Sequence, residues 1–567
     1  MNPAPTSSHA FWKGILLLVI IWLLCAWGAR SEFLPYDVNN TDVGTFLFQA
    51  QTFADGKLLR TTPEPREFFQ QWQAIVRDQS YAYYAPGHAL FLALPMALKL
   101  DPWMTPWLMS GCSILLMAAW TRRVFGTETA ILATCMLALS PFFGANGASL
   151  LSHSSTLALT LLFLWSITKW AQEECSISAL LSGLCLAWIF ATRPVNAVAL
   201  GTAWIPWVLW KRGMRWQNRL AWTLFFTGTS IIIAALLFYY RALCGRWTTH
   251  LFTDYWPRNK FGFGTDLGRG EPGHFFQTYA NHDFHGMLAN WKYSLEALAL
   301  WWSGNTWVSL LLLVIAGLLV FFRSSSPRFT MHPSRDNGMT PSSSSLSLCI
   351  PFIFWMLLHI FLYSLYYTPS TGFSGPRYLT EILPALAGLT SLLFLSAARS
   401  RPAIAVLLLM IFAGSTAWFK SGFYASHAKG SKMKRQVEQT VWTGAQPPAL
   451  IFLRSFWIGH PYPIFLNSSC MNHPILFACD RGEENRRLVE RYPGRNAYIL
   501  SVTPGLKGSV QSELILIYEA STHHWIRDPG RVSAPFFIGG RFTPSLELRD
   551  ETARRLFHPK PEEIVGQ

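Results

Sequence analysis

Residues Leu220–Tyr240 read LAWTLFFTGTSIIIAALLFYY, a stretch that contains no charged side chain. A helix that crosses the hydrocarbon core of a bilayer needs about 20 apolar residues, so this stretch predicts one membrane span. Strand-like alternation is absent, and backbone groups in lipid must pair internally, which favours helices. Further apolar stretches of about this length bring the prediction to about eleven spans; they are Gly14–Ala29, Pro102–Thr121, Thr129–Ala148, Ser154–Thr168, Cys175–Thr192, Pro194–Trp210, Ala297–Phe322, Leu348–Tyr367, Pro376–Ala398 and Pro402–Phe419.

The composition of the whole chain also indicates a membrane protein. Of its 567 residues, 51% are hydrophobic and 14% are charged, whereas a soluble domain carries roughly a quarter charged residues. The apolar content excludes a disordered chain, and nine cysteines in this length exclude a small disulfide scaffold. A net charge of +15 is compatible with nucleic-acid binding. Cytoplasmic Lys and Arg explain the same sign, so we expect an all-α polytopic bundle and no nucleic acid.

The segment Pro86–Leu100 is apolar but short, with Pro95 inside it, so its length favours an interfacial or re-entrant segment. The positive-inside rule supports this choice, because Lys and Arg gather on the cytoplasmic side of membrane proteins. Counting the segment as a span would place several basic loops outside. Without that span the following residues share the cytoplasmic side: Lys13, Arg122, Arg123, Lys169, Lys211, Arg212, Arg215, Arg219, Arg323, Arg328, Arg335, Arg399 and Arg401.

These assignments place the N-terminus in the cytoplasm and divide the chain into two parts. Residues 1–419 form the predicted transmembrane domain, and residues 420–567 form an extracytoplasmic domain. Within the first part, residues 30–86 and 241–296 are outer loops, and the Ser-rich residues 323–347 are a cytoplasmic loop. The first helix is expected to stay uncleaved, because no clean A-x-A site follows it.

The part after Lys420 changes character and predicts a small α/β or α+β domain. Short apolar runs at Ala449–Phe452, Ala497–Val502 and Leu514–Tyr518 alternate with clusters of Pro, Gly and Asn, a pattern typical of strands and turns. Two of its cysteines, Cys470 and Cys479, could pair in an oxidising compartment. A pair of free thiols is equally compatible with the sequence, because disulfide geometry is not visible there.

The first outer loop carries the residues with the clearest chemical potential. Asp42 opens an amphipathic stretch with apolar residues at helical spacing, and a helix N-cap is the structural explanation for it. Downstream, Tyr83–His88 reads YYAPGH and leads directly into the interfacial segment. A carboxylate and a Pro-Gly element therefore lie in the first outer loop and at its end, before the interfacial segment.

This pattern resembles the polytopic GT-C glycosyltransferases, such as the protein O-mannosyltransferases and the lipid A aminoarabinose transferases. In those enzymes an Asp-Glu-x-x-Tyr-type motif lies in the first outer loop, and a Tyr/Pro-Pro-Gly-type element follows it. Asp42 matches the acid, Phe46 stands where Tyr is usual, and Tyr84-Ala85-Pro86-Gly87 matches the second element. Val43 replaces the usual Glu, so a partner acid for metal or acceptor binding is missing or is supplied elsewhere.

Two further matches extend the resemblance over roughly Gly14–Phe419. Arg193-Pro194 closes a helix that runs outward, and Gly375–Leu379, with Glu381 and Pro384, opens a late helix. The resemblance implies an inverting glycosyltransferase with a GT-C-like bundle in a bacterial inner membrane. Its donor would be a polyprenyl-phosphate-linked sugar, and its acceptor a glycan, a lipid or a protein on the outer face. Many such enzymes work without a bound metal, so we expect no cofactor; a divalent metal is the alternative that the sequence leaves open.

The predicted roles follow from charge and position. Asp42 is the expected general base, because a carboxylate can take the proton of an acceptor hydroxyl. Arg193 and Arg377 are the expected ligands of the leaving phosphate, since guanidinium groups pair with phosphate in a bidentate manner. Snorkelling to the interface is the alternative for each arginine, although both break the inside bias. The remaining candidates for substrate binding are Tyr84, His88, His153, Tyr378 and Glu381; for His153, capping by its Ser-rich surroundings explains the residue about equally well.

Two motifs in the second large outer loop carry weaker signals. The glycine-rich run Gly262–His274 lacks the Gly-Lys-Ser/Thr ending of a P-loop, so we expect a structured loop over the active site. The segment Asn281–His285 reads NHDFH, but its spacing is unlike that of zinc sites and no fourth ligand is near. We therefore expect no metal there.

Two other functions remain open at the level of the sequence. A flippase or transporter of lipid-linked sugars, or another protein of envelope-polysaccharide assembly, predicts ionisable residues near helix midpoints and repeated halves. A non-catalytic scaffold predicts that Asp42, Arg193 and Arg377 lie scattered. A transferase predicts that these three side chains share one substrate-sized site, within about 10–15 Å.

Overall fold

The computed structural model describes most of the chain, and the following account concerns those residues alone. The Ser-rich loop lies mostly outside them, as do Cys470, the end of the glycine-rich run and the residues after 532. The described residues are 8–32, 41–69, 73–147, 149–213, 218–248, 251–269, 278–312, 344–367, 375–400, 402–453, 467, 471–504 and 510–532.

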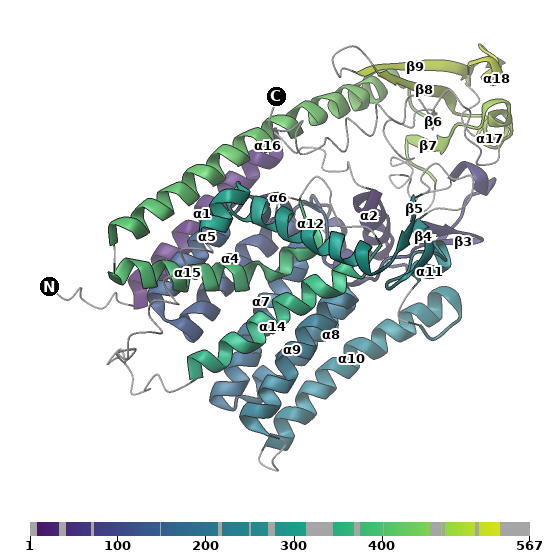
Figure 1. The fold of residues 1–567 in the computed structure, drawn as a ribbon. Helices are drawn as coiled ribbons and strands as arrows, with labels where there is room; N and C mark the ends of the chain where they lie inside the picture. Colours follow the sequence, from purple (N-terminus) through teal and green to yellow (C-terminus); the bar gives the residue numbers. More distant parts are fainter. Residues whose placement is uncertain are drawn as a thin grey trace.

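The larger part of the molecule is a bundle of helices around one apolar core (Figure 1). Large side chains from early and late helices meet in this core. The ring of Phe352, for example, lies 5.1 Å from that of Trp120 and 5.0 Å from that of Trp204. The bundle helices are α1 (Ser8–Glu32), α4 (Met104–Phe125), α5 (Thr127–Leu139), α7 (His153–Glu173), α8 (Ser176–Phe190), α9 (Pro194–Arg212), α10 (Arg219–Cys244), α14 (Ser344–Ser364), α15 (Leu383–Ser400) and α16 (Pro402–Gly444).

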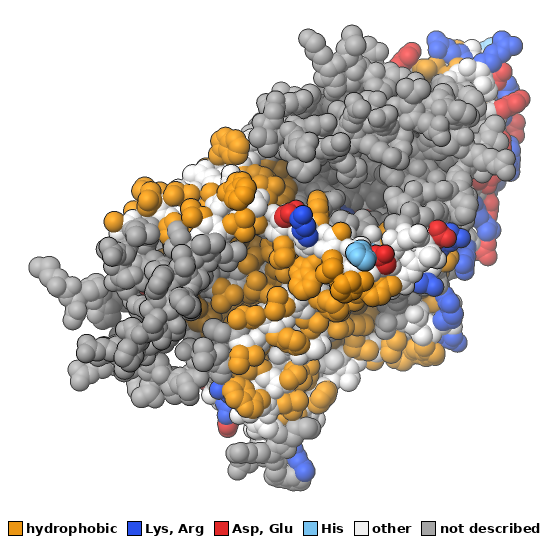
Figure 2. Space-filling view, viewed as in Figure 1, with side chains coloured by type: hydrophobic (Ala, Val, Ile, Leu, Met, Phe, Trp, Pro, Cys, Tyr) orange, Lys and Arg blue, Asp and Glu red, His pale blue; other side chains and the backbone are white. Residues whose placement is uncertain are grey.

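Among the described residues, three helices are long and apolar enough to cross a membrane by length and composition alone. They are Ser8–Ser31, Arg219–Cys244 and Val406–Ala425, and one bent pair of helices brings the number to four. The count of about eleven spans is therefore not confirmed. The apolar helices and a surface rich in hydrophobic side chains over the bundle nevertheless support a membrane-embedded protein (Figure 2).

The predicted span Thr129–Ala148 is bent in the structure. Helix α5 ends at Leu139, and α6 (Pro141–Gly147) leaves it at an angle of 64°. Ser140 between them has extended backbone angles, which is the preference of a residue that precedes proline. Hydropathy reports only the apolar content, so it does not reveal this bend. As a result, α6 lies next to η3 (Arg377–Ile382).

The structure also gives the helices that three other predicted segments contain. Pro86–Leu100 contains α3 (Gly87–Ala97), which at about 1.5 Å per residue is too short to cross, as its interfacial assignment requires. The span Ala297–Phe322 begins inside α12 (Phe284–Ser303), which ends at Gly304 with a left-handed backbone. The span Pro376–Ala398 begins as the 3₁₀ helix η3 (Arg377–Ile382) before it continues as α15.

The outer segments form a second layer over one end of the bundle. The first outer loop contains α2 (Thr41–Ala54), η1 (Arg66–Phe69) and a small antiparallel sheet in the order β1-β3-β2. The second contains α11 (Phe252–Tyr255) and the hairpin of β4 and β5. The strands are β1 (Arg60–Thr61), β2 (Ala74–Val76), β3 (Gln79–Ala82), β4 (Gly264–Arg269) and β5 (Thr278–His282).

The C-terminal part is a five-stranded mixed sheet in the order β10-β9-β8-β6-β7, which confirms the three predicted strands. Strand β6 pairs in parallel with β7 and β8, whereas β9 is antiparallel to β8 and β10. Helix α16 continues past Lys420 to Gly444 and carries the chain from the bundle to this sheet (Figure 1). The strands are β6 (Ala449–Leu453), β7 (Ile475–Cys479), β8 (Asn496–Pro504), β9 (Val510–Glu519) and β10 (His524–Trp525), with η6 (Gly482–Glu484), α17 (Asn485–Arg491) and α18 (Pro529–Val532) beside them.

The C-terminal sheet and the first outer loop share one apolar core. Phe68 and Phe69 of η1 are buried among residues of β6, β7 and β8, and the ring of Phe68 lies 6.2 Å from that of Phe452. Nearby, Arg60 donates to the Thr52 hydroxyl on α2 at 2.9 Å and to the Asn467 carbonyl at 3.0 Å. Burial lowers the pKa of Arg60 to about 10, so its guanidinium stays charged at neutral pH. Helix α2, which carries Asp42 in its first turn, is thereby attached to the C-terminal part.

This attachment predicts the effect of removing the buried ring. Phe68→Ala leaves a cavity in the shared core, and such a change typically costs about 3–5 kcal/mol. We expect limited trypsinolysis of the full chain in detergent to release the C-terminal part markedly faster than in the wild type. Leu58→Ala in the same loop, where the side chain is exposed, is the matched control and should not change the rate. Equal cleavage of all three proteins would contradict the shared core.

Candidate functional site

Asp42 lies in the first turn of α2, where the helix dipole favours a negative charge. Its carboxylate contacts side chains from distant parts of the described chain. Gln73 Nε2 and the Tyr84 hydroxyl donate to Oδ1 at 2.9 and 2.7 Å. Arg377 Nη2 forms an ion pair with Oδ2 at 3.0 Å. The first outer loop and a segment more than three hundred residues later thus meet at one carboxylate.

The Asp42–Arg377 pair keeps limited access to solvent. The two side chains are 13% and 11% exposed, respectively. An ion pair in this position is screened less than a surface pair, and it remains open to a ligand that approaches from outside. The geometry therefore combines a held carboxylate with a guanidinium that can exchange its partner.

Aromatic packing supports Tyr84 from the side of α2. Phe46, which stands where the resembled motif has Tyr, stacks on Tyr84 with ring centroids 4.7 Å apart. Gln49, one turn further along, donates to the Tyr84 carbonyl at 3.1 Å and to the Tyr239 hydroxyl at 2.9 Å. Val43, at the position of the usual Glu, is fully buried in an apolar cluster. The side of α2 that would carry a second acid therefore packs inward.

The glycine of the Pro-Gly element is required for steric reasons. Gly87 N donates to the Ala191 carbonyl at 2.8 Å, so α3 begins against the turn between α8 and α9. A Cβ on Gly87 would lie 2.7 Å from the Ala191 oxygen and 2.3 Å from Thr192 Oγ1. Only glycine permits this approach, which fixes the turn immediately before Arg193.

A second glycine acts in the same way before Arg377. Gly375 has φ +75°, a left-handed conformation that L side chains rarely adopt, and a Cβ there would lie 2.5 Å from the Trp301 ring. The Arg377 amide donates to the Gly375 carbonyl at 2.7 Å, which begins η3. The motif Gly375-Pro376-Arg377 thus uses backbone geometry to place the guanidinium at the outer end of the bundle.

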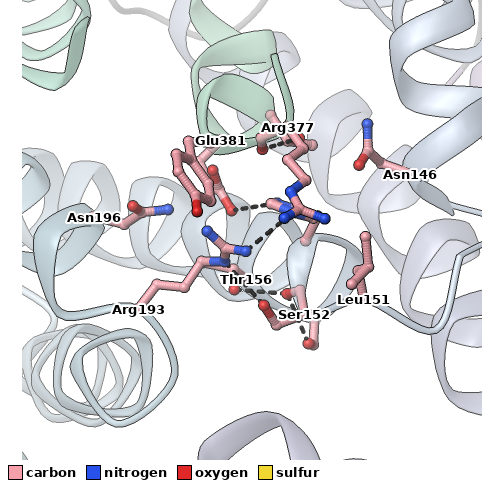
Figure 3. Close-up of polar contacts among 12 residues, drawn as sticks. Asn146, Leu151, Ser152, Thr156, Arg193, Asn196, Arg377 and Glu381 are labelled. Carbon is pink, nitrogen blue, oxygen red and sulfur yellow. Dashed lines mark hydrogen bonds and ion pairs between the residues drawn. The ribbon is translucent and has the colours of Figure 1, made fainter. Parts of the chain in front are cut away.

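Arg193 precedes α9 and points toward the same region from the other side (Figure 3). Its Nε donates to Ser152 Oγ at 2.9 Å, and its Nη2 donates to His153 Nε2 at 3.0 Å. The Tyr378 ring connects the two arginines, because it lies 5.3 Å from the Arg193 guanidinium carbon and 5.8 Å from that of Arg377. These distances are within the range of cation–π attraction.

Tyr378 is itself held by contacts with α14. Its ring stacks on Tyr363 of α14 with centroids 4.9 Å apart, and its carbonyl accepts from His359 Nε2 at 2.8 Å. The β4–β5 hairpin packs on the same aromatic group through Leu267. The described part of the glycine-rich run therefore belongs to a hairpin beside the site, in line with the expected structured loop.

His153 and Glu381 are buried beneath the arginines. Their side chains are 0% and 1% exposed, and Glu381 Oε1 lies 3.7 Å from His153 Nδ1. Both were predicted as substrate contacts. Both side chains are thus more deeply buried than Asp42 and Arg377, which are 13% and 11% exposed.

His88 is another predicted substrate contact that is buried. It is fully buried, with Nε2 donating to the Leu150 carbonyl at 2.9 Å and Nδ1 lying 2.8 Å from Ser155 Oγ. Burial lowers the pKa of His88 to about 4, so the ring is neutral at neutral pH. With both ring nitrogens in contact with protein, His88 supports Phe46, whose ring it meets at 4.9 Å.

The NHDFH segment has structural roles. His282 is buried, with Nε2 donating to the Ser364 carbonyl at 3.1 Å. Asp283 is the N-cap of α12 and accepts from the Gly286 amide at 2.8 Å. Within the residues that the structure describes, no three His, Cys, Asp or Glu side chains come together as metal ligands would.

Comparison with known proteins gives similarities in structure only. No protein-family model matches the chain, and no curated protein matches it in sequence. Among solved structures, apo ArnT from Cupriavidus metallidurans matches over 92% of this chain and 99% of its own, with 12% identity and a TM-score of 0.49. The same protein bound to undecaprenyl phosphate matches over 89% and 98%, with 12% identity and a TM-score of 0.47.

A second similar protein is the archaeal oligosaccharyltransferase AglB from Archaeoglobus fulgidus, in complex with an inhibitory peptide and a dolichol-phosphate. It matches over 89% of this chain and 75% of its own, with 9% identity and a TM-score of 0.45. At these identities and TM-scores the likeness concerns the fold, and the function must be inferred from the site itself.

Several residues of the site carry no signal in the sequence. Gln73 bonds Asp42, and Ser152 bonds Arg193, but isolated Gln and Ser residues are common in loops. Asn196, one turn into α9, accepts from the Tyr363 hydroxyl and lies beside Glu381 in Figure 3. A polar residue at the outer end of an apolar helix is the only sign that could have pointed to it.

The approach of α3 to the α8–α9 turn predicts a strong effect of one methyl group. Gly87→Ala must displace the Ala191 backbone, and overpacking of this kind typically costs about 1–3 kcal/mol. We expect a lower thermal unfolding temperature of the detergent-solubilised protein. Gly414→Ala in α16, where a Cβ would meet nothing within 4 Å, is the matched control and should leave that temperature unchanged. An unaltered Gly87→Ala protein would show that the approach is not tight.

Proposed function

We propose that this chain is an integral membrane glycosyltransferase that moves a sugar from a polyprenyl-phosphate carrier to an acceptor on the outer face of the membrane. The observation that supports it most directly is the ion pair between Asp42 and Arg377 at 3.0 Å, connected through Tyr378 to Arg193. One carboxylate and two guanidinium groups at the same end of an apolar bundle are the groups that such a transfer needs.

The two arginines suit the phosphate of the carrier. A phosphate ester that leaves an anomeric carbon gains negative charge, and guanidinium groups stabilise that charge through paired N–H donors. Arg377 holds Asp42 in an ion pair. A bound phosphate would compete with the carboxylate for this guanidinium, so donor binding would release Asp42 from its ion pair.

Asp42 suits the acceptor. In the proposed reaction its carboxylate takes the proton of an acceptor hydroxyl while the acceptor oxygen forms a bond to the anomeric carbon. The bond from that carbon to the phosphate oxygen breaks, and polyprenyl phosphate leaves with the electron pair. The new bond forms opposite the leaving group, so the anomeric configuration inverts. Gln73 and Tyr84 keep the carboxylate oriented through their bonds to Oδ1.

The arrangement disfavours a non-catalytic scaffold. A scaffold predicts that the charged outer residues lie scattered, whereas Asp42, Arg377 and Arg193 are linked by contacts through a single tyrosine. Ionisable side chains that are connected by contacts at one end of an apolar bundle are functional candidates by default.

Asp42→Asn tests the proposed base. An amide cannot accept the proton of the acceptor, and loss of a general base typically lowers the rate by about 10²–10⁴-fold. The measurement is the release of undecaprenyl phosphate, followed by mass spectrometry, from a panel of undecaprenyl-phosphate sugars in nanodiscs with added envelope acceptors. Release should depend on the acceptor and should nearly vanish in the variant.

The control for this experiment is Asp78→Asn. Asp78 lies in the same outer loop, and its side chain is 86% exposed and paired with Arg66. This variant should release undecaprenyl phosphate at the wild-type rate. Full activity of Asp42→Asn would refute the role of Asp42 as the base, and no acceptor-dependent release from any sugar of the panel would count against the transferase itself.

A further inference from the structure

A chain of buried polar contacts extends from Glu381 to Arg193. Glu381 Oε1 lies 3.7 Å from His153 Nδ1, and His153 Nε2 lies 3.0 Å from Arg193 Nη2 (Figure 3). Neither carboxylate oxygen makes a hydrogen bond of standard geometry within the described residues. A buried carboxylate is costly unless a compensating positive charge lies near. The arrangement of this chain therefore needs an explanation.

The polarity of the chain follows from the chemistry of arginine. A guanidinium has only donors, so His153 Nε2 must be the acceptor of its contact with Arg193. A neutral His153 then carries its proton on Nδ1, the ring nitrogen that lies 3.7 Å from Glu381 Oε1. Carboxylate, imidazole and guanidinium thus follow one another in a buried row.

The chain of contacts ends on the Arg193 guanidinium, which protein groups hold without using all of its N–H donors. Among the described residues, Ser152 Oγ accepts from Nε of Arg193 and His153 Nε2 accepts from its Nη2. The Tyr378 ring lies over its guanidinium carbon. The orientation of Arg193 is therefore set from the buried side, while donors remain for an anion.

We propose that Glu381 is a positioning residue that acts through His153 to orient Arg193 for the carrier phosphate, without touching the substrate itself. This inference rests on the proposed function, and it replaces the expectation that Glu381 and His153 bind the substrate directly. Glu381 supplies the negative charge that balances Arg193 inside the bundle. It also keeps the proton of His153 on the nitrogen that faces away from the arginine.

The site then contains two arginine–carboxylate units that differ in burial. Asp42 and Arg377 form the partly exposed unit, whose partners can exchange for substrate groups. Glu381, His153 and Arg193 form the buried unit, which has a fixed geometry. Tyr378 lies between the two guanidinium groups.

A double-mutant cycle in binding of undecaprenyl phosphate tests this role. The full-length protein in nanodiscs is titrated with undecaprenyl phosphate, and with undecaprenol as the control for the lipid tail. We expect Glu381→Gln and Arg193→Gln each to weaken phosphate-dependent binding by about tenfold, which corresponds to about 1.4 kcal/mol. The double variant should bind no more weakly than Arg193→Gln alone, because Glu381 acts through Arg193. Additive losses, or unchanged binding by Glu381→Gln, would overturn the proposal.

Substitutions of His153 test the intermediate contact. His153→Leu removes both ring contacts and should match the loss in Glu381→Gln. His153→Gln retains an acceptor and a donor in one side chain and should restore part of the affinity. Glu173→Gln at the opposite end of the same helix, where Glu173 pairs with Arg123, is the control and should bind as the wild type does. Equal affinity of His153→Leu and the wild type would refute the connection.

The outcomes separate this inference from the proposed function. If the wild type binds undecaprenyl phosphate no better than undecaprenol, the proposed function fails. The coupling between Glu381 and Arg193 is then measured without lipid, from the thermal unfolding temperatures of the same four proteins. Non-additive temperatures support the positioning contact, and additive temperatures refute it. If Glu381→Gln does not yield monodisperse protein, His153→Leu replaces it in both cycles.

Discussion

The ion pair between Asp42 and Arg377 is the contact on which the arrangement of the outer layer depends. It joins the start of α2 to the start of η3, which are far apart in the sequence. Two charges that leave water at the end of an apolar bundle need each other as partners, because either one alone would be costly. The pair thereby determines how the first outer loop lies against the late helices.

Backbone geometry provides the accuracy that this pair needs. Gly87 allows α3 to touch the turn before Arg193, and Gly375 allows η3 to begin against Trp301. Arg60 and Phe68 fasten the other end of the first outer loop to the C-terminal sheet. The side chains of the site are thus placed by close contacts at both ends of the segment that carries Asp42.

Asp42, Arg193 and Arg377 could be singled out in the sequence, because they match the resembled motifs and because the two arginines break the inside bias. The structure connects the three side chains by contacts. Gln73 and Ser152 could not be found, since their role depends on which distant segment folds against them. The strands of the C-terminal part were predicted from short apolar runs, whereas the bend between α5 and α6 and the continuation of α16 past Lys420 were not. Hydropathy measures how apolar a window is and contains no information about the direction of a helix.

Burial separates the side chains that we propose to react from those that we propose to hold them. Asp42 and Arg377 are 13% and 11% exposed, whereas Glu381 and His153 are 1% and 0% exposed. A carboxylate that exchanges protons or partners must be reachable, and a carboxylate that orients an arginine works best where water does not compete. In our proposals the same two residue types, Arg and an acid, therefore serve two different purposes in one site. The sequence pattern alone assigned them one role, because it records the charge of a side chain and not its depth.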